Sequence, residues 1–196
     1  MEISNSIYGD MYPYLIETMD RLTCHIEAIR EDMKRSNGMD PVEHVLGRIK
    51  SEESMREKCR RNDLPEDKDS ALDKIHDAIG IRIVCAFIDD VYVMRDKILE
   101  LEGIELFKEK DYIKHVKPNG YRSFHMIIRV DGKVYAEIQL RTISMDTWAA
   151  LEHHMKYKKN IQGNNELIVR ELKRCADELA STDESMQTLK DMINDL

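Results

Sequence analysis

The chain has 196 residues, which is long enough for one domain with a hydrophobic core and too short for two full-sized domains. Its formal net charge of -8 argues against a protein that coats nucleic acid, so any site for anions must be local. The 4 cysteines lack metal-site or disulfide-framework spacing, and the sequence shows neither a secretory leader nor an apolar stretch of membrane-spanning length. We therefore expect a cytoplasmic protein with no membrane partner.

The first predicted element is a long amphipathic helix that ends near residues 36–38. Its apolar residues recur at steps of four and three, which places them along one stripe: Leu15, Met19, Leu22, Ile26, Ile29 and Met33. Gly38 supplies a C-terminal cap, and Pro41 restarts the chain. We expect this helix to pack rather than to carry chemistry.

Basic side chains gather in the next stretch. Arg48 and Lys50 lie two apart, as on one face of a short strand, and Ser54, Lys58 and Arg61 are spaced as on one face of a helix. Together they could converge on a polyphosphate. Because glutamates are interleaved with them, a solvated helix with internal ion pairs is the alternative. The polar stretch that follows, residues 62–70, is typical of a loop.

A buried strand is predicted over residues 81–87, after a short helix that runs into Gly80. Arg82 is unusual in such a strand, so it either extends from the strand's end to solvent or stacks on something bound there. Asp77 lies just before the strand, where a loop could present a magnesium ligand, although carboxylates at helix ends are commonly structural.

A second basic patch follows an amphipathic helix predicted over residues 90–100 and a short strand that begins at residue 104. Its residues are Lys108, Lys110, Lys114, His115 and Lys117. Two local basic patches in an otherwise acidic protein are typical of a site for small anionic molecules.

A β-hairpin is predicted around Asp131-Gly132, because alternating runs flank this turn-forming pair. One face should be core: Phe124, Met126, Ile128, Val130, Val134, Ala136, Ile138 and Leu140. The other face carries polar or aromatic residues: Tyr121, Ser123, His125, Tyr135, Glu137, Gln139 and Arg141. Such a face is costly to bury without partners, so it is either a wet surface or a site.

Two helices are predicted after the hairpin. On the first, His153 and His154 point in different directions and do not form a chelating pair. The second has apolar residues at steps of four and three: Ile168, Leu172, Cys175, Leu179, Thr182, Met186, Leu189 and Ile193. This period predicts lengthwise packing on the N-terminal helix or on another copy of the chain, and we favour oligomerisation.

Common nucleotide-binding and hydrolase motifs are missing from the sequence, including the P-loop, the dinucleotide-binding glycines, the kinase catalytic loop, the G-x-S-x-G elbow and the H-E-x-x-H helix. If the basic patches bind nucleotide phosphates, Asp77 and Glu137 are the carboxylates placed to hold Mg²⁺. Tyr121 beside Asn119 would give a base a ring to stack on and an amide to read its edge.

Five segments in order closely resemble the synthetase domain of the RelA/SpoT family. They are G-R-I-K with S-M-R-E-K (residues 47–58), D-A-I-G-I-R-I (77–83), K-P-N-G-Y-R-S-F-H (117–125), A-E-I-Q-L-R-T (136–142) and W-A-A-L-E-H-H-M-K-Y-K (148–158). Because no hydrolase domain precedes them, the chain looks like a stand-alone small alarmone synthetase, and we expect no hydrolase activity.

The resemblance implies a reaction and a fold. The reaction is transfer of pyrophosphate from ATP to the 3′-hydroxyl of GDP or GTP, which releases AMP and gives ppGpp or pppGpp in the stringent response. The fold is α/β (α+β), with a mixed, largely antiparallel sheet of about five strands packed by helices, as in nucleotidyltransferases. One domain over residues 1–196 would comprise an N-terminal helix (1–38), the synthetase core (41–158) and an oligomerisation helix (164–196). The resemblance also implies a homotetramer, regulated by alarmone or RNA.

The resemblance assigns roles to individual residues. For ATP, Arg48 and Arg82 would sandwich the adenine, and the phosphates would be held by Lys50, Ser54, Lys58 and Arg61. Asp77 matches the magnesium ligand, and Glu137 matches a second acidic position that is a metal ligand or the base for the 3′-hydroxyl. For GDP or GTP, Tyr121 would stack on guanine, and the other expected residues are Lys110, Lys117, Asn119, His125, Gln139, Glu152 and His153.

Two other functions stay open at this point. Toxins of the family transfer pyrophosphate to adenine nucleotides or to a tRNA end, and the acidic composition here argues against tRNA. A binding module without activity is the second, and the joint presence of Asp77, Arg82, Tyr121 and Glu137 argues against it.

Overall fold

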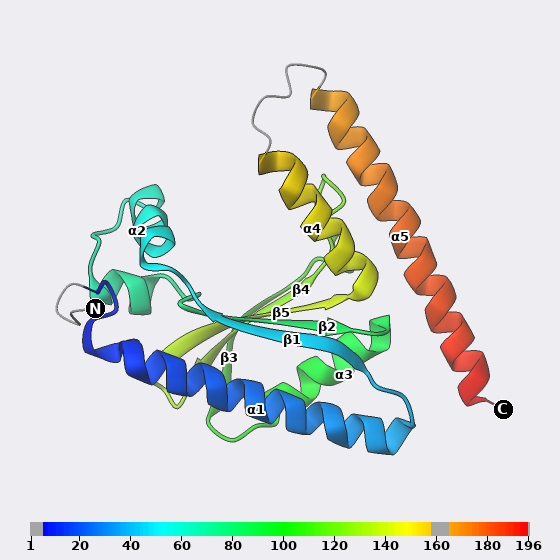
Figure 1. Cartoon of the computed structure of the whole chain (residues 1–196), viewed down its shortest axis with the longest axis horizontal. Helices are drawn as coiled ribbons and strands as arrows, with labels where there is room; N and C mark the ends of the chain where they lie inside the picture. Colours follow the sequence, from blue (N-terminus) through cyan, green and yellow to red (C-terminus); the bar gives the residue numbers. More distant parts are fainter. Residues whose placement is uncertain (1–5, 158–164, 196) are drawn as a thin grey trace.

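The computed structural model describes residues 6–157 and 165–195, and within them five strands form one mixed sheet (Figure 1). The strands, in spatial order, are β1 (Val42–Ile49), β2 (Ile79–Cys85), β5 (Val134–Thr142), β4 (Phe124–Val130) and β3 (Ile104–Asp111). β2 and β5 pair in parallel, and the other neighbours pair antiparallel. The expected mixed, largely antiparallel five-stranded sheet is therefore confirmed.

Helices lie on both faces of the sheet. They are a short turn η2 (Gly9–Met11), α1 (Tyr12–Asn37), α2 (Glu52–Arg61), a single π-helical turn η3 (Ser70–Lys74), α3 (Ile88–Leu99), α4 (Ile143–Tyr157) and α5 (Asn165–Asn194). α1 and α3 cover one face, while α2 and α4 rise at opposite ends of the other (Figure 1). In the described residues, no helix combines the length and apolar character that a membrane crossing requires.

The hydrophobic core lies between the sheet and the helices α1 and α3. All eight hairpin residues predicted to face the core are buried there. On α1, Leu15, Leu22, Ile26 and Met33 of the predicted stripe are buried as well, and the helix is capped by Gly38 at a φ of 73°. Burial of alternate residues on one face leaves the opposite face of β4 and β5 free for polar side chains.

Two local predictions were wrong. The short helix does not run into Gly80: it is the η3 turn, which ends at Lys74, and the strand already begins at Ile79 and ends at Cys85. Pairing with β1 places Gly80 opposite Arg48, whose side chain would lie 3.8 Å from a Cβ there. Long-range strand pairing therefore overrides the local helical pattern. Ser123 comes just before β4, and although it is buried, its hydroxyl accepts a hydrogen bond of 3.4 Å from Nε of Arg141, the residue predicted to share its face.

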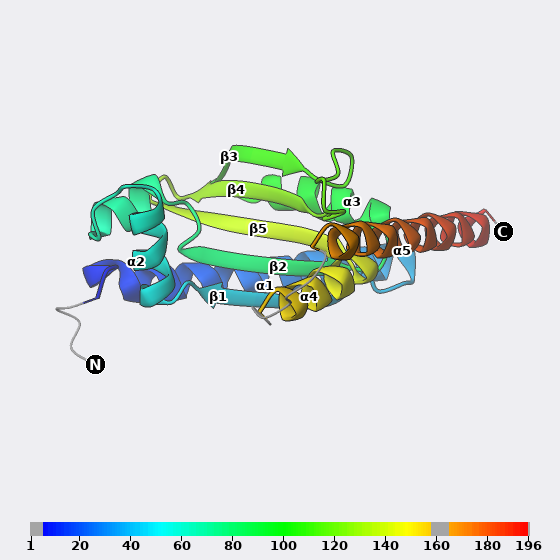
Figure 2. The ribbon, with the colours of Figure 1, turned by 90° about the horizontal axis from the view of Figure 1, so that it is seen from above.

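The C-terminal helix α5 packs against α4 and α3. The N-terminal helix, one of the two anticipated partners, instead contacts β1, β2 and α3 (Figure 2). Trp148 on α4 donates its indole N–H to the carbonyl of Leu172 over 2.8 Å. Near the other end, the buried Lys190 ammonium lies 2.8 Å from Asp89 and 2.9 Å from Asp90 at the start of α3. Both ends of α5 are thus fixed to the core by polar contacts.

The apolar stripe of α5 is only partly covered. The buried positions are Ala176, Asp183 and Lys190, which follow the predicted seven-residue period but lie one position from the predicted stripe. As a result Leu189 is 52% and Ile193 62% exposed. The period was predicted correctly, but in the second half of the helix the apolar residues point away from the rest of the chain.

Candidate active site

The polar face of the sheet brings together side chains from three adjacent strands. His125 on β4 and Arg82 on β2 both lie opposite Gln139 on β5. Glu137, two residues earlier on β5, points to the same side, as the alternation of strand residues requires. The juxtaposition predicted from the hairpin pattern is confirmed for His125, Glu137 and Gln139.

Glu137 is a partly buried carboxylate of this face that two neighbours contact directly. Its Oε1 lies 3.2 Å from Nδ1 of His125, and its Oε2 accepts a hydrogen bond of 3.2 Å from the amide of Gln139. Burial raises the pKa of the Glu137 carboxyl, but the bonds from His125 and Gln139 and the charge of Lys58 outweigh it, so the net shift of this pKa is downward. Glu137 is therefore an anion at neutral pH.

Arg141 is a buried member of this cluster to which the sequence assigned no role. It donates to the Tyr121 hydroxyl at 2.7 Å, to the side-chain amide oxygen of Gln139 at 3.0 Å and to Asp146 at 3.0 Å. Asp146, in the first turn of α4, also lies 3.3 Å from Arg82. Its predicted place on the polar face of the hairpin was a signal for Arg141, whereas no motif or spacing pointed to Asp146.

A first cleft, of about 150 Å³, lies over β1 and β2. Six residues predicted for the site line it: Arg48, Lys50, Asp77, Arg82, Glu137 and Gln139. Arg48 and Arg82 extend from neighbouring strands, and the Arg82 Nε is buried without a hydrogen-bond partner among the described residues. Two guanidinium groups over one cleft suit a planar, electron-rich ligand.

The basic helix α2 stands at one end of this cleft. The ammonium of Lys58 lies 2.7 Å from Asp77 and that of Lys50 3.1 Å, both at Oδ2. Ser54 and Arg61 are exposed on α2 and do not line the cleft in the part of the chain that the structure describes. The structure therefore brings Lys50 and Lys58 together at Asp77, and leaves Ser54 and Arg61 outside the lining of the first cleft.

A second cleft, of about 270 Å³, lies over β3 and β4. It is lined by Lys108, Glu109, Lys110, Tyr112, Lys117, His125, Ile127 and Glu137. The Lys117 ammonium lies 4.3 Å from the ring centre of Tyr112 and 4.9 Å from that of Tyr121. Tyr112 was not predicted from the sequence. Glu137 lines both clefts, so one carboxylate separates two cationic pockets.

The loop before β4 positions Asn119 and Tyr121. The Asn119 side chain accepts a hydrogen bond from the Tyr121 backbone N–H at 3.2 Å and donates to Glu152 of α4 at 3.3 Å. His153, the next residue on α4, is exposed and lines neither cleft among the described residues. Glu152 thus holds the loop through Asn119, whereas His153 lies outside the lining of both clefts.

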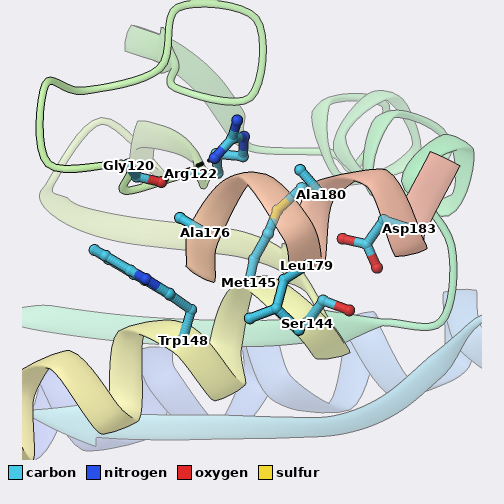
Figure 3. A pocket seen from close by; sticks show the side chains of 9 residues that line it. All are labelled: Gly120, Arg122, Ser144, Met145, Trp148, Ala176, Leu179, Ala180 and Asp183. Carbon is cyan, nitrogen blue, oxygen red and sulfur yellow. Dashed lines mark hydrogen bonds between the residues drawn. The ribbon is translucent and has the colours of Figure 1, made fainter. Parts of the chain in front are cut away.

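Gly120, in the same loop, lies against α5 (Figure 3). Its φ is 92°, and a Cβ there would lie 2.7 Å from the Cβ of Ala176 and 3.1 Å from the Cα of Lys173. Arg122 donates to the Gly120 carbonyl at 3.1 Å and to Asp177 at 2.9 Å. The void at this junction is about 10 Å³, room for one water at most, so it is a packing contact rather than a ligand site.

A divalent cation fits at Asp77 and Glu137. The Asp77 Oδ1 is buried and has no hydrogen-bond partner among the described residues, although both lysines occupy Oδ2. The described residues contain no group of three or more His, Cys, Asp or Glu that could hold a metal alone. Mg²⁺ commonly takes one or two carboxylates and obtains its other ligands from phosphate and water. The residues present therefore fit a magnesium ion that arrives with a phosphorylated substrate.

Comparison with known proteins identifies the family. Residues 47–162 match the model described as "Region found in RelA / SpoT proteins". The chain belongs to the RelA/SpoT family. It is 38% identical to the GTP pyrophosphokinase YwaC of Bacillus subtilis, over 88% of this chain and 85% of that protein.

Solved structures of RelA/SpoT-family proteins share the whole fold. Small alarmone synthetase 1 from Bacillus subtilis, bound to its product pppGpp, has a TM-score of 0.81 and 26% identity, over 95% of this chain and 96% of that chain. The same protein bound to AMPCPP has a TM-score of 0.74 and 25% identity over the same shares. Similarity over nearly full length means that α1 and α5 are part of the shared architecture.

The contact of Gly120 with α5 in this RelA/SpoT-family chain predicts a stability difference between two glycines. Gly132 also has a positive φ, of 67°, but a Cβ there would meet no atom within 4 Å. Gly132→Ala should lower the free energy of unfolding by about 1 kcal/mol from backbone strain alone. Gly120→Ala should lower it by about 2 kcal/mol more, because α5 or the loop must move. Urea unfolding of both variants measures the difference, and equal losses would show that α5 does not constrain the loop.

Proposed function

We propose that this chain is a GTP pyrophosphokinase that transfers pyrophosphate from ATP to the 3′-hydroxyl of GDP or GTP, producing AMP and ppGpp or pppGpp. The observation that carries the proposal is that Glu137 lines both cationic clefts. Two anionic nucleotides bound on either side of one carboxylate can place a hydroxyl of one against a phosphate of the other. The activity named for the Bacillus subtilis relative supports it. We expect the enzyme to act in the cytoplasm, where these nucleotides are available.

ATP occupies the first cleft in this proposal. Arg48 and Arg82 stack on the two faces of adenine, while Lys50 and Lys58 neutralise the phosphates. Ser54 and Arg61 reach the same phosphates from the exposed side of α2. The AMPCPP complex of the related synthetase supports an adenine nucleotide as one ligand.

GDP or GTP occupies the second cleft and the adjoining loop. Tyr121 provides the ring for guanine, and the surrounding groups are Lys110, Lys117, Asn119, His125 and Gln139. Glu152 acts through Asn119, which it holds by a hydrogen bond. We assign His153 no contact with the nucleotide, because it lies exposed away from both clefts in the described structure. The pppGpp complex of the related synthetase supports a guanosine nucleotide as the second ligand.

Asp77 and Glu137, which line the same cleft, would hold Mg²⁺. The ion, when bound, neutralises charge that develops on the transferred phosphates. The 3′-oxygen attacks the β-phosphorus of ATP, the bond from that phosphorus to the α–β bridging oxygen breaks, and AMP leaves with the bonding electrons. Glu137, ionised as its lowered pKa requires, can accept the hydroxyl proton.

We also propose that the exposed stripe of α5 joins copies of this chain into a homotetramer. Leu189, Met192 and Ile193 are 52%, 61% and 62% exposed, and they lie together at the end of a helix that extends past the sheet (Figure 1). This half of α5 is held to the rest of the chain by hydrogen bonds of Asp183 and Lys190, which lie on a different line of the helix from the exposed apolar residues. Its apolar residues therefore remain available to a second copy.

The product test is direct. The purified protein with ATP and Mg²⁺ is given GDP, GTP, GMP, ADP or uncharged tRNA in separate reactions, and products are resolved by anion exchange. We expect AMP together with a guanosine nucleotide that carries two additional phosphates. Product only with ADP or tRNA would indicate a toxin-like acceptor, and no AMP under any condition would contradict the proposal.

Glu137→Gln should abolish transfer but leave ATP affinity within about threefold, since Lys50, Lys58 and Asp77 remain in the donor cleft. Glu105→Gln, on the exposed side of β3, is the matched control. A Mg²⁺ titration separates the two roles of Glu137. Activity restored by high Mg²⁺ indicates a metal ligand, whereas a loss at every concentration indicates the base. Turnover near that of the wild type would remove Glu137 from the mechanism.

Leu189→Gln with Ile193→Gln should lower the solution mass measured by light scattering, because two polar side chains would have to be buried between copies. Ser181→Gln with Ser185→Gln, at exposed polar positions of the same helix, should leave the mass unchanged. An unchanged mass in the first variant, or a monomeric wild type, would contradict assembly through this stripe.

A further inference from the structure

Arg141 is the buried branch point of the hydrogen bonds around Glu137. Only 5% of the residue is exposed, and in the described structure it lines neither cleft. Its Nη2 donates both to the Tyr121 hydroxyl and to the side-chain amide oxygen of Gln139, while Nη1 donates to Asp146. A guanidinium group is a donor at every nitrogen and accepts nothing, so it fixes the direction of each hydrogen bond that begins from it.

The first path runs from Arg141 through Tyr121 and His125 to Glu137. The Tyr121 oxygen accepts from Arg141 and lies 2.8 Å from Nε2 of His125, so its own proton can be given to that nitrogen. A neutral imidazole that accepts at Nε2 carries its proton on Nδ1. Nδ1 is the atom 3.2 Å from the Glu137 Oε1, and an ionised carboxylate only accepts. Because the path begins at a guanidinium group that only donates and ends at a carboxylate that only accepts, every hydrogen bond along it points from Arg141 toward Glu137.

The second path is shorter and ends on the other oxygen of Glu137. Gln139 accepts from Arg141 at its Oε1, which places its amide nitrogen toward the carboxylate. That nitrogen donates to Glu137 Oε2 over 3.2 Å. If the amide turned over, its NH₂ group would face the Arg141 donor and its oxygen would face the Glu137 anion. Both contacts would then be repulsive, so Arg141 also selects this orientation.

We propose that Arg141 is a positioning residue for the transfer reaction: by donating to Tyr121 and Gln139 together, it makes His125 and Gln139 each present an N–H to Glu137. The inference rests on the proposed function of Glu137 as the carboxylate shared by the two nucleotides. Its physical effect is to hold the Glu137 carboxylate in one rotamer, with an N–H directed at each of its oxygens, before substrates bind.

Other charges also act on Glu137 and set the background for the test. They come from the elements around the two clefts: Lys50, Lys58, Asp77, Arg82, Lys108, Lys110 and Lys117. None of them bonds to Tyr121 or Gln139 in the hydrogen bonds of the described structure as Arg141 does. A change at Arg141 therefore alters the two paths without removing a side chain from either cleft.

Arg141→Lys tests the inference while keeping a positive charge beside Asp146. Lysine is shorter and ends in a single nitrogen, which cannot take the place of Nη2 between Tyr121 and Gln139 and of Nη1 at Asp146 together, so the two paths lose their fixed direction. We expect kcat to fall about 10-fold with little change in either KM. Arg129→Lys, on the exposed side of β4, is the matched control.

The tautomer of His125 is a readout that needs no turnover. Imidazole ¹⁵N shifts, assigned with a His125→Gln variant, should show the Nδ1–H form in the wild type and a mixture in Arg141→Lys. Tyr121→Phe breaks only the first path and keeps the ring, so it should give the same mixture if Arg141→Lys does not fold. An unchanged tautomer and an unchanged kcat in these variants, or a mixture of tautomers in the wild type, would overturn the inference. A wild type with the Nδ1–H form but no product would instead overturn the proposed function.

Discussion

The parallel pairing of β2 with β5 is the constraint on which the rest of this structure depends. It sets Gly80 beside Glu137 and Arg82 beside Gln139, and it brings Asp77, just before β2, to the same end of the sheet. A hairpin cannot join parallel strands, so α3, β3 and β4 are inserted between β2 and β5. This connection covers one face with α3 and returns β4 beside β5. The two clefts and their shared carboxylate follow from that one register.

Local periodicity predicted much of the site because its central part is a hairpin. Alternation alone placed His125, Glu137 and Gln139 on one face, and their pairing in the sheet agrees. The errors occur where residues far away in the sequence determine the local structure. Gly80 lies in a strand and not at a helix end, because β1 pairs with it. The roles expected for Arg48, Lys50 and Asp77 come from the family resemblance, because the local pattern left surface charges as an alternative.

The C-terminal helix shows how a correct period can still leave the covered face undetermined. The four-and-three pattern predicts a stripe, but the rest of the chain decides which line of residues it buries. Here Asp183 and Lys190 are buried because Thr142 and the start of α3 offer them partners. Ala176 is buried because Gly120 has no side chain, so the helix can approach the loop that carries Tyr121. Thus α5 contacts the loop that carries Tyr121 at a glycine, while the apolar stripe of its second half stays exposed.

Burying Arg141 costs desolvation free energy, which Asp146 offsets only in part. An apolar residue of similar size would pack without that cost, but the Tyr121 hydroxyl and the Gln139 amide would then be free to rotate. The same Asp146 oxygen also lies near Arg82, which lines the first cleft, so Asp146 links that cleft to the hydrogen bonds around Tyr121. Since Glu137 lines both clefts, its proposed role depends on neighbours that direct their donors at it. A buried cation that can only donate is the simplest device that fixes both neighbours at once.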